Sequence, residues 1–498
     1  MRFWTAIVII TCLAVVGLTY EIAAGRVLAP FFGTSLITWT AVIATVLAGF
    51  SLGNALGGLV AERERRAAMR AVRTALVTTA ILMALSPTAL ALLYALGARG
   101  TGGMLLSVVL AFFPASVLVS LPSPLLAKLA VEARPGREGS SLGMVLAAGS
   151  VGAIFGAILA GFVTLPLIGS AATFTACGAA ALFCVPFVRA GASDDDDNGA
   201  ARIERREVRA AVGPAALIVV ASVANGSVCR YESGLSCIDV VQRGSAIQLM
   251  SDRTQQAAER TLRPGEPLES SPELILEYTQ WLWARMDRDL GEAPSVLFIG
   301  GGGYTLPTAL LASRPAAEAI AVEIDPLITS VVRAHLPRAG AMIERAGYDA
   351  DRTGGAASAD DGRLGIVHED GRVYINEAGR RFDAAVMDAF SSGSVPAHLA
   401  TIETYRRLKA IVDGPVYVNL IDTPDGRLAR GIHAILTELY PHVDAAQGPV
   451  SDRGQANTVL AAAEAPFDPL DTLPRDYAPV SIGPGRAFTD DRGWFGHR

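Results

Sequence analysis

Hydrophobic and polar residues are distributed very differently along the two halves of this 498-residue chain. Residues 3–188 consist of long apolar runs separated by short charged loops. Uncharged runs of about 20 residues are long enough to cross a lipid bilayer as helices. The pattern therefore predicts a polytopic α-helical transmembrane bundle over residues 1–188. Its six spans are expected near 3–25, 36–60, 74–97, 103–127, 141–165 and 169–188.

The chain after residue 228 has the mixed pattern of an ordinary soluble protein. Short alternating segments at Ser236–Gln242 and Ala246–Met250 predict antiparallel strands, and Glu273–Arg288 has the periodicity of a helix. We expect these elements to form a small β/helix unit over residues 228–290.

From Val296 onwards, apolar strands alternate with helices, which is typical of a parallel sheet covered on both faces. This order predicts a Rossmann-like α/β domain over residues 291–498. The stretch 338–363 is rich in Gly, Ala and Asp and has no apolar period, so we expect a surface loop there. Strands are expected at Val296–Ile299, Ala319–Ile324, Leu364–His368, Phe382–Asp388 and Val416–Ile421.

The connection between the halves, residues 189–227, leaves the location of the soluble half open. Residues 189–209 are small and polar, as in a flexible linker, whereas Ala210–Val228 carries no charge. If this run crosses the membrane as a seventh helix, the soluble half lies outside the cytoplasm. If it lies on the membrane or packs in the soluble core, the soluble half lies inside.

Loop charges favour the seventh crossing. Arg and Lys gather in the loops after the second, fourth and sixth spans, and such an excess marks cytoplasmic loops. We therefore expect a multi-pass cell-membrane protein with a cytoplasmic N-terminus and an extracytoplasmic soluble half. The residues concerned are Arg63, Arg65, Arg66, Arg70, Arg73, Lys128, Arg134, Arg137, Arg189, Arg202, Arg205, Arg206 and Arg209.

Composition excludes some classes of partner. The net charge is −6 and no basic stripe is interleaved with aromatic residues, so no nucleic acid is expected. The five Cys are too few for a disulfide framework, and their spacing predicts no metal site. Cys229 and Cys237 either form a disulfide, which needs an oxidising compartment, or are two unrelated buried thiols.

Polar and small residues inside the spans predict how the helices meet. Glu21 and Arg26 lie near the end of the first span, where an ionisable group is costly unless it is paired or faces a cavity. They are either structural, or they line a substrate path together with Asn54. Small residues four apart predict close helix packing. They are Gly49, Gly53 and Gly57 in the second span, and Gly152, Gly156 and Ala160 in the fifth.

In sheets of this class, ligands bind at the carboxyl ends of the strands. The first strand of the soluble half is followed by Gly300, Gly301 and Gly302, whose backbone can turn sharply and approach a nucleoside. Glu323 ends the second strand, where a carboxylate can accept both ribose hydroxyls. The alternative for Glu323 is a purely structural role.

Two further carboxylates follow the third and fourth strands. Asp370, with Gly371 beside it, either accepts an exocyclic amine next to a purine or begins a helix as an Asx turn. Asp388 opens the loop Ala389–Ala397, and it either takes a proton from an attacking amine or caps a helix. Proton transfer to Asp388 would suit group transfer from a sulfonium.

Taken in order, these segments resemble the spermidine synthase (polyamine aminopropyltransferase) family. The resemblance implies a small N-terminal β unit followed by a Rossmann-like methyltransferase-type sheet. It also implies transfer of an aminopropyl group from decarboxylated S-adenosylmethionine, a co-substrate and not a prosthetic group, to putrescine or a related amine, leaving methylthioadenosine. The segments that carry it are Val296–Gly303, Val322–Pro326, Glu369–Arg372, Phe382–Asp388, Thr401–Tyr405 and Thr489–Asp491.

By position, the resemblance implies that Glu323 holds the ribose, Asp370 and Gly371 hold the adenine, and Asp388 accepts the proton. The glycines at 300–302 would receive the adenosyl group.

The chain departs from the family pattern on the amine side. Gly303-Tyr304 stand where the family has Asp-Gly, Ser391 stands at the place of a second Asp, and Tyr278-Thr279-Gln280 replace a Tyr-His-Glu type segment. Neutral groups bind a dication more weakly, because charge-assisted hydrogen bonds are roughly twice as strong as neutral ones. Tyr304 is expected to offer its ring or its hydroxyl to the ligand.

We therefore expect a membrane-fused aminopropyltransferase, with a homodimer left open. Two other functions fit the same sheet: S-adenosylmethionine-dependent methyl transfer, and a non-catalytic transporter or sensor that binds a polyamine or a nucleoside. A nicotinamide enzyme is not expected, because Thr305 stands where a third glycine would be needed.

Overall fold

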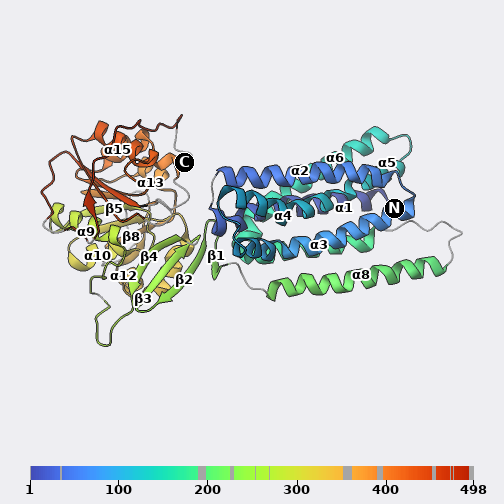
Figure 1. Ribbon diagram of the computed structural model, residues 1–498, viewed down its shortest axis with the longest axis horizontal. Helices are drawn as coiled ribbons and strands as arrows, with labels where there is room; N and C mark the ends of the chain where they lie inside the picture. Colours follow the sequence, from blue (N-terminus) through green and yellow to red (C-terminus); the bar gives the residue numbers. More distant parts are fainter. Residues whose placement is uncertain are drawn as a thin grey trace. The chain divides into compact units, whose positions relative to one another are not determined.

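The computed structural model divides into two compact units, Met1–Cys237 and Ile238–Arg498 (Figure 1). For residues 198–205, 207, 209 and 223 it describes the backbone alone. The described residues are 2–33, 36–188, 198–224, 229–252, 254–268, 270–351, 362–389, 396–450, 456–470, 473–474 and 476–492.

The first unit is a bundle of long apolar helices. Among the described residues, five helical segments are long and apolar enough to cross a membrane: Phe3–Phe32, Leu36–Ala61, Arg65–Ala95, Gly100–Glu132 and Glu138–Phe187. They make this a multi-pass membrane protein by length and composition, as expected.

The last of these segments, 50 residues long, contains both of the final two predicted spans. It is divided at Gly169, whose φ of 75° and ψ of 175° are not helical. The helices are α1 (Phe3–Phe32), α2 (Leu36–Ala61), α3 (Arg65–Ala95), α4 (Gly100–Ser120), α5 (Pro122–Glu132), α6 (Glu138–Leu159), α7 (Leu165–Cys184) and α8 (Asn198–Ala224), with a π-helical turn at Ala160–Thr164 and a 3-10 turn at Val185–Phe187.

Small residues bring the helix backbones together, as their spacing predicted. At Gly152 of α6, an added Cβ would lie 2.5 Å from the carbonyl oxygen of Thr11 in α1. At Gly49 of α2, it would lie 2.6 Å from the Cβ of Ser116 in α4. Larger residues at these positions would push the helices apart, so the small residues set the packing distance.

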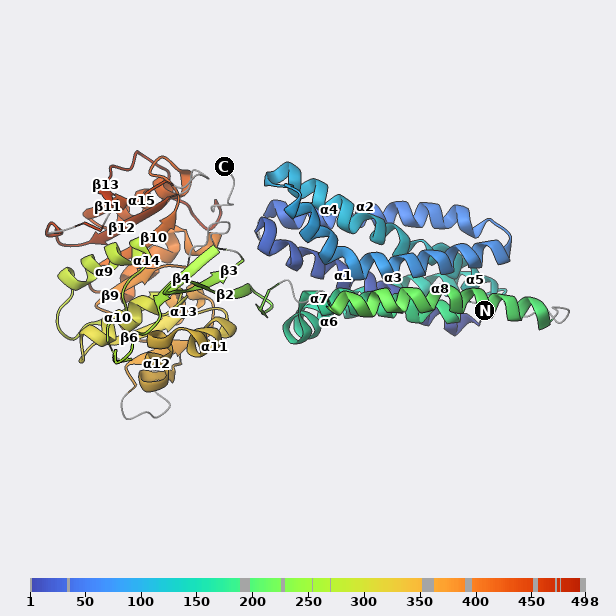
Figure 2. The ribbon, with the colours of Figure 1, turned by 60° about the horizontal axis from the view of Figure 1, so that its bottom comes forward.

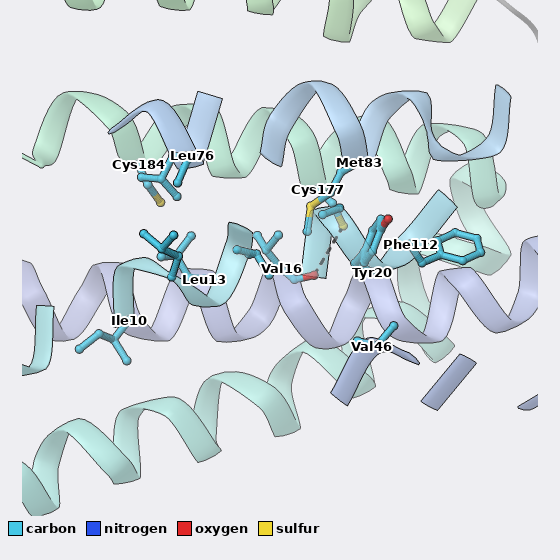
Figure 3. Close-up of a cluster of buried hydrophobic side chains, with 14 of the residues drawn as sticks. Ile10, Leu13, Val16, Tyr20, Val46, Leu76, Met83, Phe112, Cys177 and Cys184 are labelled. Carbon is cyan, nitrogen blue, oxygen red and sulfur yellow. Dashed lines mark hydrogen bonds between the residues drawn. The ribbon is translucent and has the colours of Figure 1, made fainter. Parts of the chain in front are cut away.

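Apolar and aromatic side chains fill the centre of the bundle (Figure 3). Tyr20 of α1 is fully buried, and its ring packs edge-on against Phe112 and Phe174. Its hydroxyl lies 2.8 Å from the hydroxyl of Ser86. A buried phenol needs such a partner, so Tyr20 ties α1 to α3 through a polar contact inside an apolar core.

The polar residues of the first span do not form the three-residue path considered from the sequence. Glu21 and Arg26 are both buried in α1, and Arg26 Nε donates to the carbonyl of Ser233 at 3.3 Å. Asn54, by contrast, is exposed on α2. The path through all three is therefore wrong, because Asn54 does not face the interior where Glu21 is buried.

The two ends of the helix bundle are formed by different parts of the first unit. At its N-terminal end, the guanidinium of Arg134 stacks 3.6 Å from the ring of Phe3. At the other end of the bundle, Glu232 accepts a hydrogen bond from the backbone N–H of Ser170 at 3.0 Å, within a segment closed by the disulfide Cys229–Cys237. Helix α8 packs along α3 and α7 between these ends (Figure 2).

The second unit begins with a small antiparallel sheet, as predicted. Its strands β2 (Cys237–Arg243) and β3 (Ala246–Ser251) match the two alternating segments, and a further strand, β4 (Thr254–Arg260), pairs with β3. The pairing shifts between Leu249 and Met250, which leaves Gln256 as the extra residue of a β-bulge in β4. Helix α9 (Glu277–Asp289) follows.

A nine-stranded sheet then forms the core of the second unit, in the order β13-β11-β12-β10-β9-β5-β6-β8-β7. The predicted strands are all present and are mutually parallel, which confirms the Rossmann-like α/β class. The strands are β5 (Ser295–Ile299), β6 (Glu318–Val322), β7 (Gly347–Asp349), β8 (Leu364–Val367), β9 (Ala384–Met387), β10 (Val416–Ile421), β11 (His442–Gln447), β12 (Asn457–Ala463) and β13 (Ala478–Pro479).

Two features of this sheet were not predicted. Strands β11, β12 and β13 extend it antiparallel beyond β10. The stretch 338–363 is not simply a loop, because α12 (Pro337–Ala346) and β7 occupy its first part; residues 352–361 lie outside the described ranges. Helix α12 buries Met342 and Ile343, a short apolar face that its Gly and Ala residues obscure in the sequence.

The remaining helices connect the strands. They are α10 (Thr305–Ser313), α11 (Pro326–His335), α13 (Gly371–Glu377), α14 (Ile402–Ile411) and α15 (Arg427–Leu439), with a 3-10 turn at Ala397–Leu399.

Candidate functional site

The four positions singled out in the sequence follow four neighbouring strands. In the sheet order β9-β5-β6-β8, Asp388 follows β9, Gly300 follows β5, Glu323 follows β6, and Asp370 comes shortly after β8. These strands are parallel, so their carboxyl ends share one edge of the sheet. The fold therefore brings the predicted residues to a single edge.

The glycine turn after β5 is shaped by both conformation and space. Gly300 and Gly302 have φ values of 95° and 50°, where glycine is strongly favoured. An added Cβ at Gly300 would lie 2.5 Å from the carbonyl oxygen of Asp388, and one at Gly301 would lie 3.1 Å from the Cβ of Glu323. The turn thus runs between the ends of β9 and β6, with little room for a side chain.

Glu323 holds this turn in place. Its carboxylate accepts hydrogen bonds from the backbone N–H groups of Gly302 at 2.8 Å and Asp325 at 3.0 Å. Burial raises the pKa of Glu323 to about 7, although both donors act in the opposite direction. Glu323 therefore has the structural role that was considered from the sequence. Each carboxylate oxygen can accept a second bond, so binding of ribose hydroxyls remains compatible with it.

Asp370 is a helix cap in this structure. One of its oxygens accepts hydrogen bonds from the backbone N–H groups of Arg372 at 2.9 Å and Val373 at 3.2 Å, at the start of α13. The other lies 2.8 Å from Nε2 of His398. The Asx-type alternative is thus what the structure shows, and His398 occupies one accepting position that an adenine amine would need.

Residues next to Asp370 make close contacts at this edge of the sheet. An added Cβ at Gly371 would lie 2.6 Å from Cγ2 of Ile299, so the glycine lets α13 pack against β5. The Arg372 guanidinium pairs with both oxygens of Asp490, at 2.5 and 2.6 Å, and Thr401 also donates to Asp490. This pairing lowers the pKa of Asp490. It also holds the Thr489–Asp491 segment, near the end of the chain, against α13.

Asp388 does not cap a helix among the described residues. Its two oxygens instead accept hydrogen bonds from the Tyr278 hydroxyl at 3.1 Å and from Nδ2 of Asn419 at 2.8 Å. Asn419 is itself held by Nδ2 of Asn457 at 2.9 Å. Burial raises the pKa of Asp388 to about 6, while its two donors oppose that rise. Such a carboxyl is positioned and mostly ionised at neutral pH, and its pKa lies close enough to neutral pH for it to act as a proton acceptor.

A pocket opens between the glycine turn, the end of β9 and the bulged strand β4. Gly300, Gly301, Gly302 and Asp388 line it, whereas Glu323, Asp370 and Gly371 do not. The pocket therefore lies on the β9 side of the turn. Its other lining residues are Gln256, Ala258, Leu276, Tyr278, Thr279, Phe298, Gly303, Thr305, Leu306, Pro307 and Val386.

Sequence reasoning missed the residues that hold Asp388. Tyr278 was identified only as part of a departure from the family pattern. Asn419 carried a signal that went unused: it is a polar residue, 2% exposed, inside the apolar strand β10. A buried amide within a strand needs partners, and here it bridges Asp388 and Asn457.

Tyr304 does not face the ligand pocket, contrary to expectation. Its side chain is fully buried, and its hydroxyl lies 2.7 Å from that of Thr329, which in turn lies 2.9 Å from Nε2 of His368. Its own φ of 56° lies in the left-handed region. Tyr304 therefore has a structural role, because its buried side chain packs behind the glycine turn, away from the pocket. Ser391 lies outside the described residues.

Comparisons with known proteins concern the C-terminal half. No protein-family model matches the chain, and no curated protein matches its sequence. A probable spermidine synthase from Corynebacterium glutamicum is 17% identical, with a TM-score of 0.41 over 52% of this chain and 95% of its own length. Spermidine synthase from Thermotoga maritima is 16% identical, with a TM-score of 0.35 over 53% of this chain and 80% of its own.

A methyltransferase also matches this half. Human methyltransferase-like protein 13, solved in complex with SAH, is 21% identical, with a TM-score of 0.29 over 40% of this chain and 86% of its own. The C-terminal half thus shows a distant structural similarity to spermidine synthases and to a methyltransferase.

Proposed function

We propose that the second unit binds an adenosyl sulfonium at the carboxyl edge of its sheet and transfers the aminopropyl group of decarboxylated S-adenosylmethionine to an amine. The observation that carries the proposal is Asp388, a half-buried carboxyl oriented by Tyr278 and Asn419 beside the glycine turn. Putrescine or a related amine would be the acceptor, and methylthioadenosine the by-product.

The reaction follows from the position of Asp388. The Asp388 carboxylate takes a proton from the incoming ammonium, which frees the nitrogen lone pair. That lone pair attacks the carbon bonded to sulfur, the new N–C bond forms, and the C–S bond breaks with both electrons going to sulfur. Methylthioadenosine leaves uncharged, so the chain must supply orientation more than stabilisation of a leaving group. Glu323 would accept the ribose hydroxyls, and Asp370 with Gly371 would lie beside the adenine.

The test uses the full chain in nanodiscs. Calorimetry with methylthioadenosine measures nucleoside binding, and mass spectrometry after incubation with decarboxylated S-adenosylmethionine and an amine detects the aminopropylated product. We expect both signals, and we expect Asp388→Asn to remove the second but not the first. If S-adenosylmethionine instead yields a methylated amine, the enzyme is a methyltransferase.

We also propose an extracytoplasmic location for the second unit. The Arg134 loop and the Cys229–Cys237 segment lie at opposite ends of the helix bundle, and the disulfide favours an oxidising compartment. After reduction of intact cells, a membrane-impermeant thiol reagent should label Cys229 and Cys237, whereas replacing both by Ser should abolish that labelling. Labelling only after the membrane is permeabilised would place the unit inside.

This location favours a second candidate function, binding without turnover. A sulfonium donor made in the cytoplasm would not reach an extracytoplasmic site unaided. A transporter or sensor that binds a nucleoside or a polyamine would show the calorimetric signal with no transfer product, and its transport would survive Asp388→Asn.

A further inference from the structure

The carboxyl edge of the sheet has one side with several carboxylates and another side with a single carboxylate. Glu323 and Asp370 follow β6 and β8, on one side of the glycine turn. The pocket lies on the other side, between β9 and the small sheet, and Asp388 is the one carboxylate in the part of its wall that the structure describes. If the nucleoside occupies the β6–β8 side, this pocket is where the acceptor must enter.

The small sheet removes the space for a second carboxylate. An added Cβ at Gly303 would collide with the Cβ of Ala257 in β4. An Asp at this position, as in the resembled family, is therefore excluded by packing unless β4 moves. The glycine at 303 is a consequence of this close contact.

Strand β4 makes the contact. Alternate residues of a strand share a face. Gln256 and Ala258 both line the pocket, and Ala257 between them contacts Gly303. The residues of β4 at the glycine turn therefore contribute one amide and two methyl groups.

The other polar groups of the pocket wall are neutral. Thr279 uses its hydroxyl to donate to the carbonyl of Leu276, and the Tyr278 hydroxyl donates to Asp388. Thr305 and the glycine backbone add further neutral polar groups, and Leu306 and Val386 contribute apolar side chains.

We infer that the acceptor is a primary amine whose remaining part carries no second positive charge. The inference rests on the proposed function and names the substrate class of the same site. Asp388 serves the nitrogen that reacts, so a diamine would bring a second ammonium into a pocket without a second carboxylate. Moving an unpaired charge out of water is costly, whereas an alkyl group avoids that cost and gains from burial against side chains such as Leu306 and Val386.

A matched pair of amines tests this preference. Putrescine and n-butylamine have the same four-carbon chain and differ in the terminal ammonium. Calorimetry on the full chain in nanodiscs, saturated with methylthioadenosine, measures amine binding without turnover. We expect n-butylamine to bind at least about tenfold more tightly than putrescine, since a charged hydrogen bond that is left unmade costs that much or more. Tighter binding of putrescine would overturn the inference.

A variant should weaken the expected preference. Gln256→Glu places a carboxylate in the pocket wall and should improve the putrescine-to-butylamine affinity ratio by about tenfold. Gln242→Glu is the matched control, because Gln242 is exposed on β2 of the same small sheet and does not line the pocket. The control should leave the ratio unchanged; an equal shift in both variants would show that the effect is not local to the pocket.

The outcomes separate this inference from the proposed function. Transfer to putrescine in preference to n-butylamine keeps the aminopropyl transfer and rejects the acceptor class. Preferential binding of n-butylamine without any transfer keeps the acceptor class and rejects the catalysis. If methylthioadenosine binds and neither amine does, an amine acceptor is rejected altogether.

Discussion

On the β6–β8 side of the glycine turn, carboxylates accept hydrogen bonds from backbone N–H groups, whereas on the β9 side a single carboxylate faces an otherwise uncharged pocket. The first side keeps Glu323, Asp370 and Gly371, by which the chain resembles a family, whereas the second side keeps Asp388 but has Gly303 where that family has an Asp. The difference has a physical origin in Gly303, where the small sheet approaches too closely for any side chain. Because different strands and loops form the two sides, residues on one side can change while those on the other side stay the same.

The largest expected effect is on the β9 side, at Asp388. Asp388→Asn keeps the size of the side chain and can still accept from one donor, but it cannot take a proton. Positioned general bases contribute roughly 10²–10⁴-fold to rate, so we expect the transfer rate to fall by that factor. Methylthioadenosine affinity, measured by calorimetry, should change little. Full activity of this variant would remove Asp388 from the mechanism.

The matching test on the other side is Glu323→Gln. Ribose hydroxyls donate to the ionised carboxylate more strongly than to a neutral group, so nucleoside affinity should fall about 10- to 100-fold. Burial raises the pKa of Glu323 to about 7. Affinity in the unaltered protein should therefore increase as pH rises between about pH 6 and pH 8, where the carboxylate forms. Calorimetry across this range checks both effects.

The control for this pH dependence is the Gln variant itself. Gln cannot ionise, so its lower affinity should be nearly flat over the same range. A pH dependence that persists in Glu323→Gln would assign the titration to another group. It would then leave Glu323 with only its structural contact to Gly302.

On the β9 side, Tyr278→Phe tests whether the Tyr278 hydroxyl positions Asp388 or whether the side chain only fills space. The Tyr278 hydroxyl donates to Asp388 and so holds down a pKa that burial raises to about 6. Its removal should raise that pKa further and move the midpoint of the pH–rate profile to higher pH. The rate at neutral pH should fall several-fold, in line with the loss of one hydrogen bond to a charged group. A fall in rate without a shifted midpoint would indicate that Tyr278 is only structural.

Sequence patterns predicted the fold and the edge of the sheet well, because both depend on periodic apolar residues and strand-end positions. They could not assign the contacts of each carboxylate. From the sequence, Asp370 could either bind a ligand or cap a helix. Only the positions of the Arg372 and Val373 backbone N–H groups show that it caps α13. The role of Gln256 depends on how β4 packs against the glycine turn, which leaves no local composition signal.

The smallest expected effect concerns Tyr304, which lies beneath the turn that separates the two sides. Tyr304→Phe removes a hydroxyl that lies 2.7 Å from Thr329 and keeps the buried ring. The loss of one buried hydrogen bond should lower the free energy of unfolding by about 1 kcal/mol, because Thr329 retains His368 as a partner. Denaturation followed by tryptophan fluorescence measures it. Nucleoside and amine affinities should both stay within about twofold, because Tyr304 does not line the pocket. A selective loss of amine binding would mean that the hydroxyl does reach the acceptor, and the β9 side would then hold a polar group that the buried position of Tyr304 does not show.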